Sequence, residues 1–240
     1  MHREDALAIL SQLGAVLTND HFVFTSGRHG SDYVNKDAIS AHAPIYQLCC
    51  GLAERCCSDL IDVVVAPAVG GIALAQWVAH RLRQLGNRPV AAAYAEREET
   101  GIYKADHDMT VKLLGSDYKL ESGDEVIIKK PSFVLKRGFD ALVKGKRVCV
   151  VEDILTTGGS ARKVIEAARR AGGNVVVACA LVNRGNITAE MLGNISRLEA
   201  LVDIQLDSWL ESECPLCKEG KPINPTVGKG KDFLARKQSL

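Results

Sequence analysis

Hydrophobic residues along this chain follow two spacings in turn, which predict alternating helices and strands. Four short runs are apolar almost throughout and are predicted strands: 61–67, 89–94, 148–152 and 175–182. Segments with apolar residues three and four positions apart are predicted helices: 4–17, 45–57, 72–84 and 161–171. Because strands buried on both faces belong in a sheet covered on both sides, the pattern predicts an α/β fold with a parallel sheet flanked by helices.

Two stretches depart from this alternation. Residues 98–146 are rich in Lys, Asp, Glu and Gly, and residues 110–114 and 125–128 within them could pair as a hairpin. A long polar excursion between core strands is typical of a lid or an oligomer contact, and a solvated loop is the alternative. Residues 211–240 hold three prolines, two cysteines and five lysines, and we expect an irregular tail there. The expected organisation is a domain over 1–210, with an N-terminal segment at 1–40, followed by the tail.

The composition is that of an ordinary globular protein, with 47% hydrophobic and 25% charged residues. A net charge of +1 gives no reason to expect nucleic acid or a membrane surface as a partner. No apolar run approaches the roughly 20 residues that cross a bilayer. The first residues lack the apolar core of a secretion signal. We therefore expect a cytoplasmic protein.

The eight cysteines fall into two groups. Six lie in helical or strand patterns and are expected to be buried reduced thiols: Cys49, Cys50, Cys56, Cys57, Cys149 and Cys179. Cys214 and Cys217 differ, because two thiols at this spacing can bind one metal ion or form a redox pair. A structural zinc site usually needs four ligands, and the sequence offers neither a second Cys-x-x-Cys nor a histidine pair nearby. The helical cysteines are the candidates to complete such a site in space.

One segment, residues 152–160, carries most of the candidate chemistry. Glu152 and Asp153 follow an apolar run, and a Thr/Gly/Ser turn then opens a helix. The amides and positive end of a helix bind phosphate, while carboxylates bind hydroxyls or a metal ion. Neither GxGxxG nor GxxxxGK[ST] is present, so the segment is not a dinucleotide fingerprint or a P-loop. It predicts a sugar-phosphate site, and a capped helix after a strand is the alternative.

Residues 150–160 resemble the motif that binds 5-phosphoribosyl-1-pyrophosphate (PRPP) in type I phosphoribosyltransferases. The resemblance implies that Glu152 and Asp153 bind the ribose hydroxyls. It assigns the 5-phosphate to Thr156, Thr157, Gly158, Gly159 and Ser160. The turn Ala68, Val69, Gly70 and Gly71 is similar to the family's pyrophosphate loop, although a plain structural turn would look the same. The position of Gly70 often holds lysine in orotate phosphoribosyltransferases.

Two segments resemble the base-binding parts of orotate phosphoribosyltransferases. Residues 26–36 are similar to the segment that covers the base, with His29 where lysine is common and Lys36 as a possible replacement for that charge. Asn183-Arg184 is similar to an Asp-Arg pair that holds orotate. The resemblance implies that Arg184, Tyr33 and His29 contact orotate, and arginine suits a planar carboxylate. Taken alone, Arg184 could equally be a surface cation.

The resemblance also implies the catalytic groups and the assembly. Residues 94–98 are similar to an Arg-Lys-Glu stretch in which Arg97 keeps the arginine and Glu98 replaces the lysine. Asp153, Glu152 and Arg97 are the implied catalytic residues. The implied assembly is a homodimer with shared active sites, and Mg²⁺ arrives with PRPP rather than on a protein ligand set. The candidate loop cations for the neighbouring pyrophosphate are Lys104, His107, Lys136 and Arg137.

The reaction implied is phosphoribosyl transfer from PRPP to orotate, giving orotidine 5-phosphate and pyrophosphate in pyrimidine biosynthesis. Two alternatives stay open at this point. A purine-base phosphoribosyltransferase would keep the PRPP segment without needing Arg184 for a carboxylate. A PRPP-sensing regulator would keep the binding turn and lack catalysis, as the departures at Gly70, His29 and Glu98 would allow.

Overall fold

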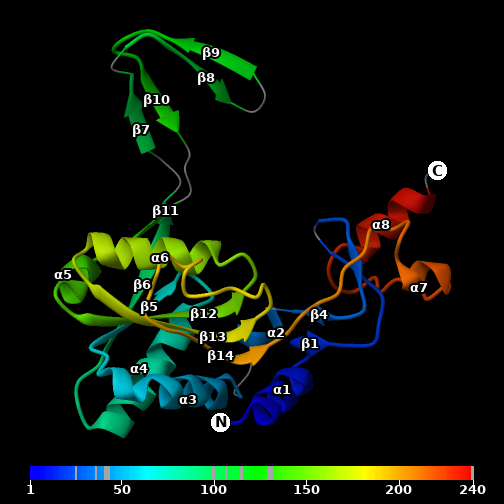
Figure 1. Ribbon diagram of the computed structural model, residues 1–240, viewed down its shortest axis with the longest axis horizontal. Helices are drawn as coiled ribbons and strands as arrows, with labels where there is room; N and C mark the ends of the chain where they lie inside the picture. The colour runs from blue at the N-terminus through cyan, green and yellow to red at the C-terminus, as the bar shows by residue number, and fades with distance from the viewer. Residues whose placement is uncertain are drawn as a thin grey trace.

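A six-stranded sheet forms the centre of the molecule (Figure 1). The computed structural model describes residues 1–24, 26–35, 37–40, 44–98, 101–105, 107–113, 116–128 and 132–238. The strands, in spatial order, are β11 (Ser132–Val134), β6 (Ala91–Glu98), β5 (Val63–Pro67), β12 (Arg147–Leu155), β13 (Asn174–Asn183) and β14 (Leu198–Asp203). Neighbouring strands run parallel except for β11, which is antiparallel to β6. The predicted parallel sheet is confirmed.

Helices cover both faces of this sheet (Figure 1). One face carries α1 (Arg3–Gln12), α3 (Ile45–Cys56) and α4 (Ile72–Gly86), and the other α5 (Phe139–Val143) and α6 (Gly159–Arg170). Successive side chains of β5 pack into opposite layers, Val64 with α3 and α4 and Val65 with α6. This double burial is why the central strands are largely apolar. No helix in the described ranges is long and apolar enough to cross a membrane.

Two strands of the sheet escaped prediction, and both lie at its edges. Only two residues of β14 are buried. Its other positions tolerate polar residues such as Glu199 and Asp203, which interrupt the apolar pattern that would have predicted a strand. In β11 Phe133 is buried against the layer that holds α6. Residues 98–146 are therefore not a single insertion as expected, because β11 and α5 at its end belong to the core.

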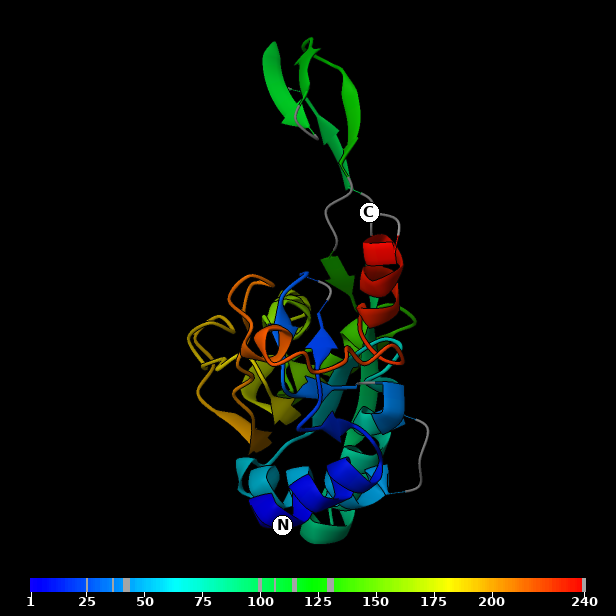
Figure 2. The ribbon, with the colours of Figure 1, turned by 90° about the vertical axis from the view of Figure 1, so that its right-hand side faces the viewer.

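The rest of this insertion is an arm of two hairpins that projects away from the sheet (Figures 1 and 2). Its strands are β7 (Gly101–Lys104), β8 (Met109–Leu113), β9 (Ser116–Leu120) and β10 (Glu125–Ile128). β8 pairs with β9 and β10 pairs with β7, so the predicted pairing of 110–114 with 125–128 is wrong. The shorter connection joins β8 to β9, and strands joined by a short connection pair with each other.

The N-terminal residues 1–40, called the hood below, pack against the tail. Besides α1, the hood contains β1 (Val16–Leu17), β2 (Phe22–Val23), β3 (His29–Gly30), β4 (Tyr33–Val34) and α2 (Asp37–Ser40). Outside the hood, a 3-10 turn (Cys57–Asp59) follows α3. The tail holds α7 (Pro215–Lys218) and α8 (Gly230–Gln238), so it is not irregular as expected. Backbone hydrogen bonds join the two, from Asn224 N–H to the His21 carbonyl and from Lys229 N–H to the Val23 carbonyl, both at 2.8 Å. Figure 2 shows the tail lying along the hood.

Candidate active site

The loops that follow four parallel strands meet at one edge of the sheet. After β5 the chain adds β6 on one side of the sheet and later β12 on the other side, so the strand order reverses between β5 and β12. Open α/β sheets bind ligands at such a switch point. A cavity of about 620 Å³ lies there. Its walls include most of the residues singled out from the sequence: Tyr33, Ala68, Val69, Gly70, Gly71, Arg97, Glu152, Asp153, Thr156, Thr157, Gly158, Gly159, Ser160 and Arg184.

The turn between β12 and α6 has the geometry of an anion site. Gly158 precedes the helix with φ +69°, which side chains with a Cβ rarely adopt, and an added Cβ would lie 2.9 Å from Cδ2 of Leu192. The first amides of α6 have no acceptor within the helix and point toward the cavity end. The Oγ1 of Thr157 accepts a hydrogen bond from Gly159 N–H at 3.4 Å. The turn therefore offers amides and a helix dipole to a phosphate.

The acid pair lies beside the turn and close to the opposite loop. Glu152 is buried and Asp153 is half-buried. Oδ1 of Asp153 accepts a hydrogen bond from Ile154 N–H at 2.6 Å. Its Oδ2 would lie 3.6 Å from a Cβ placed on Gly70. A ligand in the cavity can therefore touch the carboxylates and the loop after β5 together.

The two glycines in the loop after β5 differ in whether the structure requires glycine at that position. A Cβ on Gly71 would lie 2.7 Å from Cβ of Ala66, so the backbone leaves no room for another residue there. A Cβ on Gly70 would make only ordinary contacts. The missing lysine at Gly70 is therefore not imposed by space. The peptide bond between Ala68 and Val69 is cis.

A second cavity of about 480 Å³ adjoins the first and shares Tyr33, Thr156 and Arg184 with it. Phe24, Ser26, Leu206 and Ser208 complete its described walls, so the hood and the segment that leads from β14 into the tail enclose it. The guanidinium of Arg184 lies 5.7 Å from the centre of the Phe24 ring. This end offers a planar ligand a cation and aromatic rings.

The backbone around Arg184 is held by groups that the sequence did not reveal. Both Arg184 N–H and Gly185 N–H donate to the Leu155 carbonyl, at 2.8 and 3.0 Å. The side chain of Asn183 donates to the Ile187 carbonyl and accepts from Ile187 N–H, at 3.1 and 3.0 Å. An aspartate could only accept, so the asparagine found at this position has a structural reason. A Cβ on Gly185 would overlap the Thr156 carbonyl, which ties this turn to the phosphate turn.

His29 corrects one prediction. It lies in neither cavity wall, and its ring is completely buried between hood and tail. The pairing of β3 with β2 and the bridge from His29 to Trp209 turn it toward the tail. Its Nδ1 lies 2.9 Å from Nε2 of His21. Burial, and secondly the charge of His21, lower the pKa of His29. Because the ring is fully buried and lines neither cavity, the expected contact of His29 with orotate is wrong.

The candidate loop cations lie outside the described cavity wall. Lys136 Nζ lies 3.5 Å from Oε1 of Glu98, and Arg137 Nε donates to Oε1 of Glu96 at 2.6 Å. That hydrogen bond raises the pKa of Arg137. His107 is exposed on the arm. The backbone of Lys104 lies in β7, while its side chain and all of Lys36 fall outside the described residues. Which of them reaches a pyrophosphate stays a prediction.

The burial and the neighbours of the cysteines differ in part from the prediction. Cys49, Cys56, Cys149 and Cys179 are buried free thiols as expected, whereas Cys50 is half-buried and Cys57 is exposed. Burial raises the pKa of Cys49 to about 12. The helical cysteines do not approach Cys214 and Cys217, which lie instead beside His21 and His29. The two histidines stand far from the Cys-x-x-Cys in sequence, and their eight-residue separation in the hood was the signal available.

Comparison with known proteins agrees with this geometry. A family model described as phosphoribosyl transferase domain matches residues 35–209. The orotate phosphoribosyltransferase of Pelotomaculum thermopropionicum is 37% identical over 92% of this chain and 95% of that protein. The orotate phosphoribosyltransferase of Caldanaerobacter subterraneus subsp. tengcongensis is 35% identical over 93% of this chain and 96% of that protein.

Solved structures share the fold. The crystal structure of orotate phosphoribosyltransferase from Aeropyrum pernix is 28% identical with a TM-score of 0.53, covering 82% of this chain and 92% of that one. The Mycobacterium tuberculosis enzyme in complex with PRPP is 21% identical, with a TM-score of 0.53 over 84% of this chain and 95% of that one, and supports the fold alone. The chain belongs to the phosphoribosyltransferase family and, within it, to the orotate phosphoribosyltransferases.

Proposed function

We propose that this enzyme transfers the phosphoribosyl group of PRPP to orotate, forming orotidine 5-phosphate and pyrophosphate in pyrimidine biosynthesis. One observation carries the proposal. A single cavity wall contains the phosphate turn, the acid pair, the loop after β5 and Arg184. Relatives named orotate phosphoribosyltransferase, at 30–37% identity over nearly the whole chain, support the same activity.

PRPP would lie along the larger cavity. The amides of residues 156–160 suit its 5-phosphate, and the carboxylates of Glu152 and Asp153 suit its ribose hydroxyls. The turn 68–71 on the opposite wall would receive the pyrophosphate through its backbone. Orotate would occupy the smaller cavity, with Arg184 paired to its carboxylate and Tyr33 beside its ring.

The reaction breaks the bond between ribose C1 and the pyrophosphate oxygen, while a nitrogen of orotate attacks C1 from the opposite face. Positive charge grows on the ribose ring, and the field of the Glu152 and Asp153 carboxylates on the cavity wall would stabilise it. Negative charge grows on the leaving pyrophosphate, and Arg97 on the cavity wall opposes it. A single preorganised group of this kind contributes about 3–4 kcal/mol to the transition state.

The site has the oxygen ligands that Mg²⁺ prefers. Asp153 and Glu152 line the cavity, and Oδ2 of Asp153 faces the loop that would receive pyrophosphate. The ion would arrive with PRPP, held mainly by PRPP oxygens and water, and these carboxylates would be the protein oxygens beside it. When bound, Mg²⁺ supplies positive charge to the leaving group.

The proposal includes a cytoplasmic homodimer with shared active sites. The arm extends away from its own sheet, which would let a cation from one subunit reach the cavity of the other (Figures 1 and 2). All eight cysteines are free, in keeping with a reducing compartment. Light scattering on the purified chain tests the assembly, and a mass equal to one chain at working concentration would contradict it.

The activity is tested by mixing enzyme, PRPP, Mg²⁺ and orotate and following the ultraviolet absorbance of orotate. We expect a loss of orotate absorbance that requires both PRPP and Mg²⁺. Turnover of a purine base without turnover of orotate would overturn the proposal in favour of a purine enzyme. Tight PRPP binding without turnover of any base would instead identify a regulator.

A further inference from the structure

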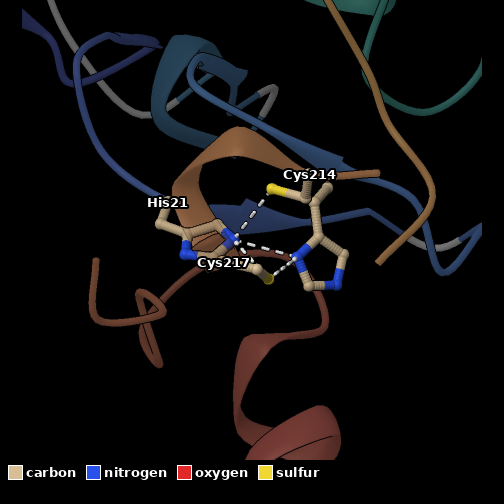
Figure 3. A group of neighbouring side chains, drawn as sticks. His21, Cys214 and Cys217 are labelled. Atoms are coloured by element: carbon tan, nitrogen blue, oxygen red, sulfur yellow. Dashed lines mark hydrogen bonds between the residues drawn. The ribbon is translucent and has the colours of Figure 1, made fainter. Parts of the chain in front are cut away.

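Four potential metal ligands converge where the hood meets the tail. His21 precedes β2, His29 lies in β3, Cys214 precedes α7 and Cys217 lies within α7. His21, His29 and Cys214 are buried, and Cys217 is half-buried. One ligand atom from each lies within 4.8 Å of all the others. Figure 3 shows the sulfurs of Cys214 and Cys217 directed at the ring of His21. We call these four residues the histidine–cysteine cluster.

The distances within the cluster suit a tetrahedral ion. Bond lengths of about 2.05 Å to nitrogen and 2.3 Å to sulfur place two nitrogen ligands about 3.3 Å apart, and a nitrogen and a sulfur about 3.6 Å apart. The two ring nitrogens lie 2.9 Å apart. The sulfurs of Cys214 and Cys217 lie 3.6 and 3.7 Å from Nε2 of His21, and Cys217 lies 3.3 Å from Nδ1 of His29. These four distances lie within a few tenths of an ångström of the tetrahedral values, and the remaining pairs of ligand atoms lie within 4.8 Å of each other.

Hydrogen bonds alone do not satisfy this group. The carbonyl of Lys221 lies 2.8 Å from Nδ1 of His21 and can only accept, so Nδ1 carries the proton of a neutral ring. Nε2 then has one lone pair, while one nitrogen and two sulfurs lie within reach of it. If Nδ1 of His29 donates to it, Nε2 of His29 keeps a bare lone pair, and that buried atom has no partner among the described residues. A cation removes the competition for Nε2 of His21, because it accepts a lone pair from each of the four converging atoms, and Nε2 of His29 then carries the proton of its ring.

We propose that His21, His29, Cys214 and Cys217 bind one zinc ion. Two thiolates and two imidazoles in a tetrahedral arrangement select zinc over magnesium or calcium, which prefer oxygen. All four positions are filled by protein, as in structural rather than catalytic sites. The hydrogen bond from Nδ1 of His21 to the Lys221 carbonyl orients the His21 ring so that Nε2 is directed toward the ion. Metal-binding histidines typically donate their second ring N–H in this way. This inference is independent of the proposed activity.

The other cysteine group in the molecule makes a useful contrast. Cys56, Cys149 and Cys179 also bring three sulfurs together, with the Cys149 and Cys179 sulfurs 3.8 Å apart. They lie in the apolar layer between α3 and the sheet, and no histidine or carboxylate joins them in the described part of the chain. Buried thiols pack well in such a layer without a metal. The zinc is therefore assigned to the histidine–cysteine cluster alone.

The ion would act on the active site through the wall it fastens. It would hold α7 of the tail to the β2–β3 hairpin of the hood. That hairpin carries Phe24 at its end, and the chain leading to α7 carries Ser208; both line the smaller cavity. Arg28 in the hairpin also donates to the Ser208 carbonyl at 2.6 Å. Zinc would thus fix the side of the cavity proposed for orotate without touching the substrate.

The test is the metal content of the full-length, untagged enzyme after growth with zinc, measured by mass spectrometry. We expect about one zinc ion per chain. Cys214→Ser combined with Cys217→Ser should lower the content by roughly tenfold or more. Cys50→Ser combined with Cys57→Ser removes two thiols from the α3 region and should leave the content unchanged, as should Cys149→Ala. Failure of the wild-type chain to bind zinc, or retention of zinc by the Cys214/Cys217 variant, would overturn the proposal.

A measurement on the wild-type chain covers the case in which the double variant does not fold. Cobalt exchanged into the site should give the intense visible absorption of a tetrahedral ion with thiolate ligands. X-ray absorption at the zinc edge should show two sulfur and two nitrogen neighbours. Three sulfur neighbours would place the metal in the core group, and an all-oxygen shell would mean surface binding; either result contradicts the assignment.

Discussion

The phosphate turn and the histidine–cysteine cluster are both proposed binding sites, and they are built in opposite ways. The turn comes from one continuous segment, 152–160, in which a strand end, a glycine with φ +69° and a helix start already present the amides. The cluster takes residues from positions 21, 29, 214 and 217 and exists only when the hood and tail have met. A backbone site therefore depends on local conformation, whereas a side-chain site depends on long-range packing.

The two regions also differ in how they reach the substrate. The turn and its acids line the larger cavity directly, whereas no residue of the cluster lines the described wall of either cavity. Changes in the turn should therefore act on PRPP and on turnover. Changes in the cluster should act on stability and on the orotate end, and the variants below separate these effects.

The largest effect is expected from Asp153→Asn. Its Oδ1 accepts from Ile154 N–H, and an amide oxygen can keep that bond, so the fold should survive. The loss of charge beside the ribose should lower kcat by roughly 100- to 1,000-fold, the range for removing one preorganised group. Steady-state kinetics at saturating substrates measures this. Glu166→Gln, an exposed carboxylate on α6 paired with Arg162, is the control and should keep normal turnover.

Zinc content should be the same in Asp153→Asn as in the wild-type enzyme. A turnover within a few fold of wild type would show that the acid pair is not at the reacting sugar. A simultaneous loss of zinc would break the separation between the two regions.

Arg184→Ala should have the next largest effect, at the point where the two cavities join. Hydrogen bonds to charged groups are worth about 1.5–3 kcal/mol, so the KM for orotate should rise by about 10- to 100-fold. PRPP affinity, measured by calorimetry, should change far less. Arg162→Ala on the exposed face of α6 is the matched control. Equal losses for both ligands would remove Arg184 from its proposed role.

Gly158→Ala tests the turn against a glycine of similar conformation. A left-handed φ costs other residues about 1–2 kcal/mol, and the new Cβ would also press on Leu192. Gly145 has φ +71°, lies before β12 away from the cavity, and has open space around its Cβ position. Both variants should lose stability in denaturant unfolding, but only Gly158→Ala should weaken PRPP binding. If Gly145→Ala weakened PRPP binding equally, the effect would be general destabilisation.

The parts that sequence predicted well are those fixed by neighbours along the chain. Strands β5, β12 and β13 were visible because burial on both faces leaves their central positions apolar, with polar residues only toward the ends of β12 and β13. The turn 156–160 was visible because its strand, glycines and helix are contiguous. The fold and most of the cavity wall follow from these two kinds of signal.

The errors concern partners distant in sequence. His29 was assigned to orotate because it stands where lysine is common in the base-covering segment of orotate phosphoribosyltransferases, whereas contacts with Trp209 and Cys217 determine where its ring lies. The pairing of β10 also depends on another part of the chain: β8 is already paired with β9, and β10 pairs with β7. Helix α8 carries few apolar residues besides Phe233, which packs against His29, so its own sequence gave little sign of it. Local patterns do not contain such pairings.

The smallest effect is expected from Ser208→Ala, which tests the contact between Arg28 of the hood and the segment that leads into the tail. The change removes the bond from Arg28 Nε to Oγ of Ser208 at 3.0 Å, while the bond from Arg28 to the Ser208 carbonyl survives. We expect a loss of about 0.5–1.5 kcal/mol in the free energy of unfolding and unchanged zinc content. Combined with the Cys214/Cys217 double variant, Ser208→Ala should cost much less, because a tail released from zinc no longer holds the segment before it, which carries Ser208, against Arg28. Additive costs in this cycle would mean that the hood and tail stay together without the metal, and that the cluster does not organise the cavity wall.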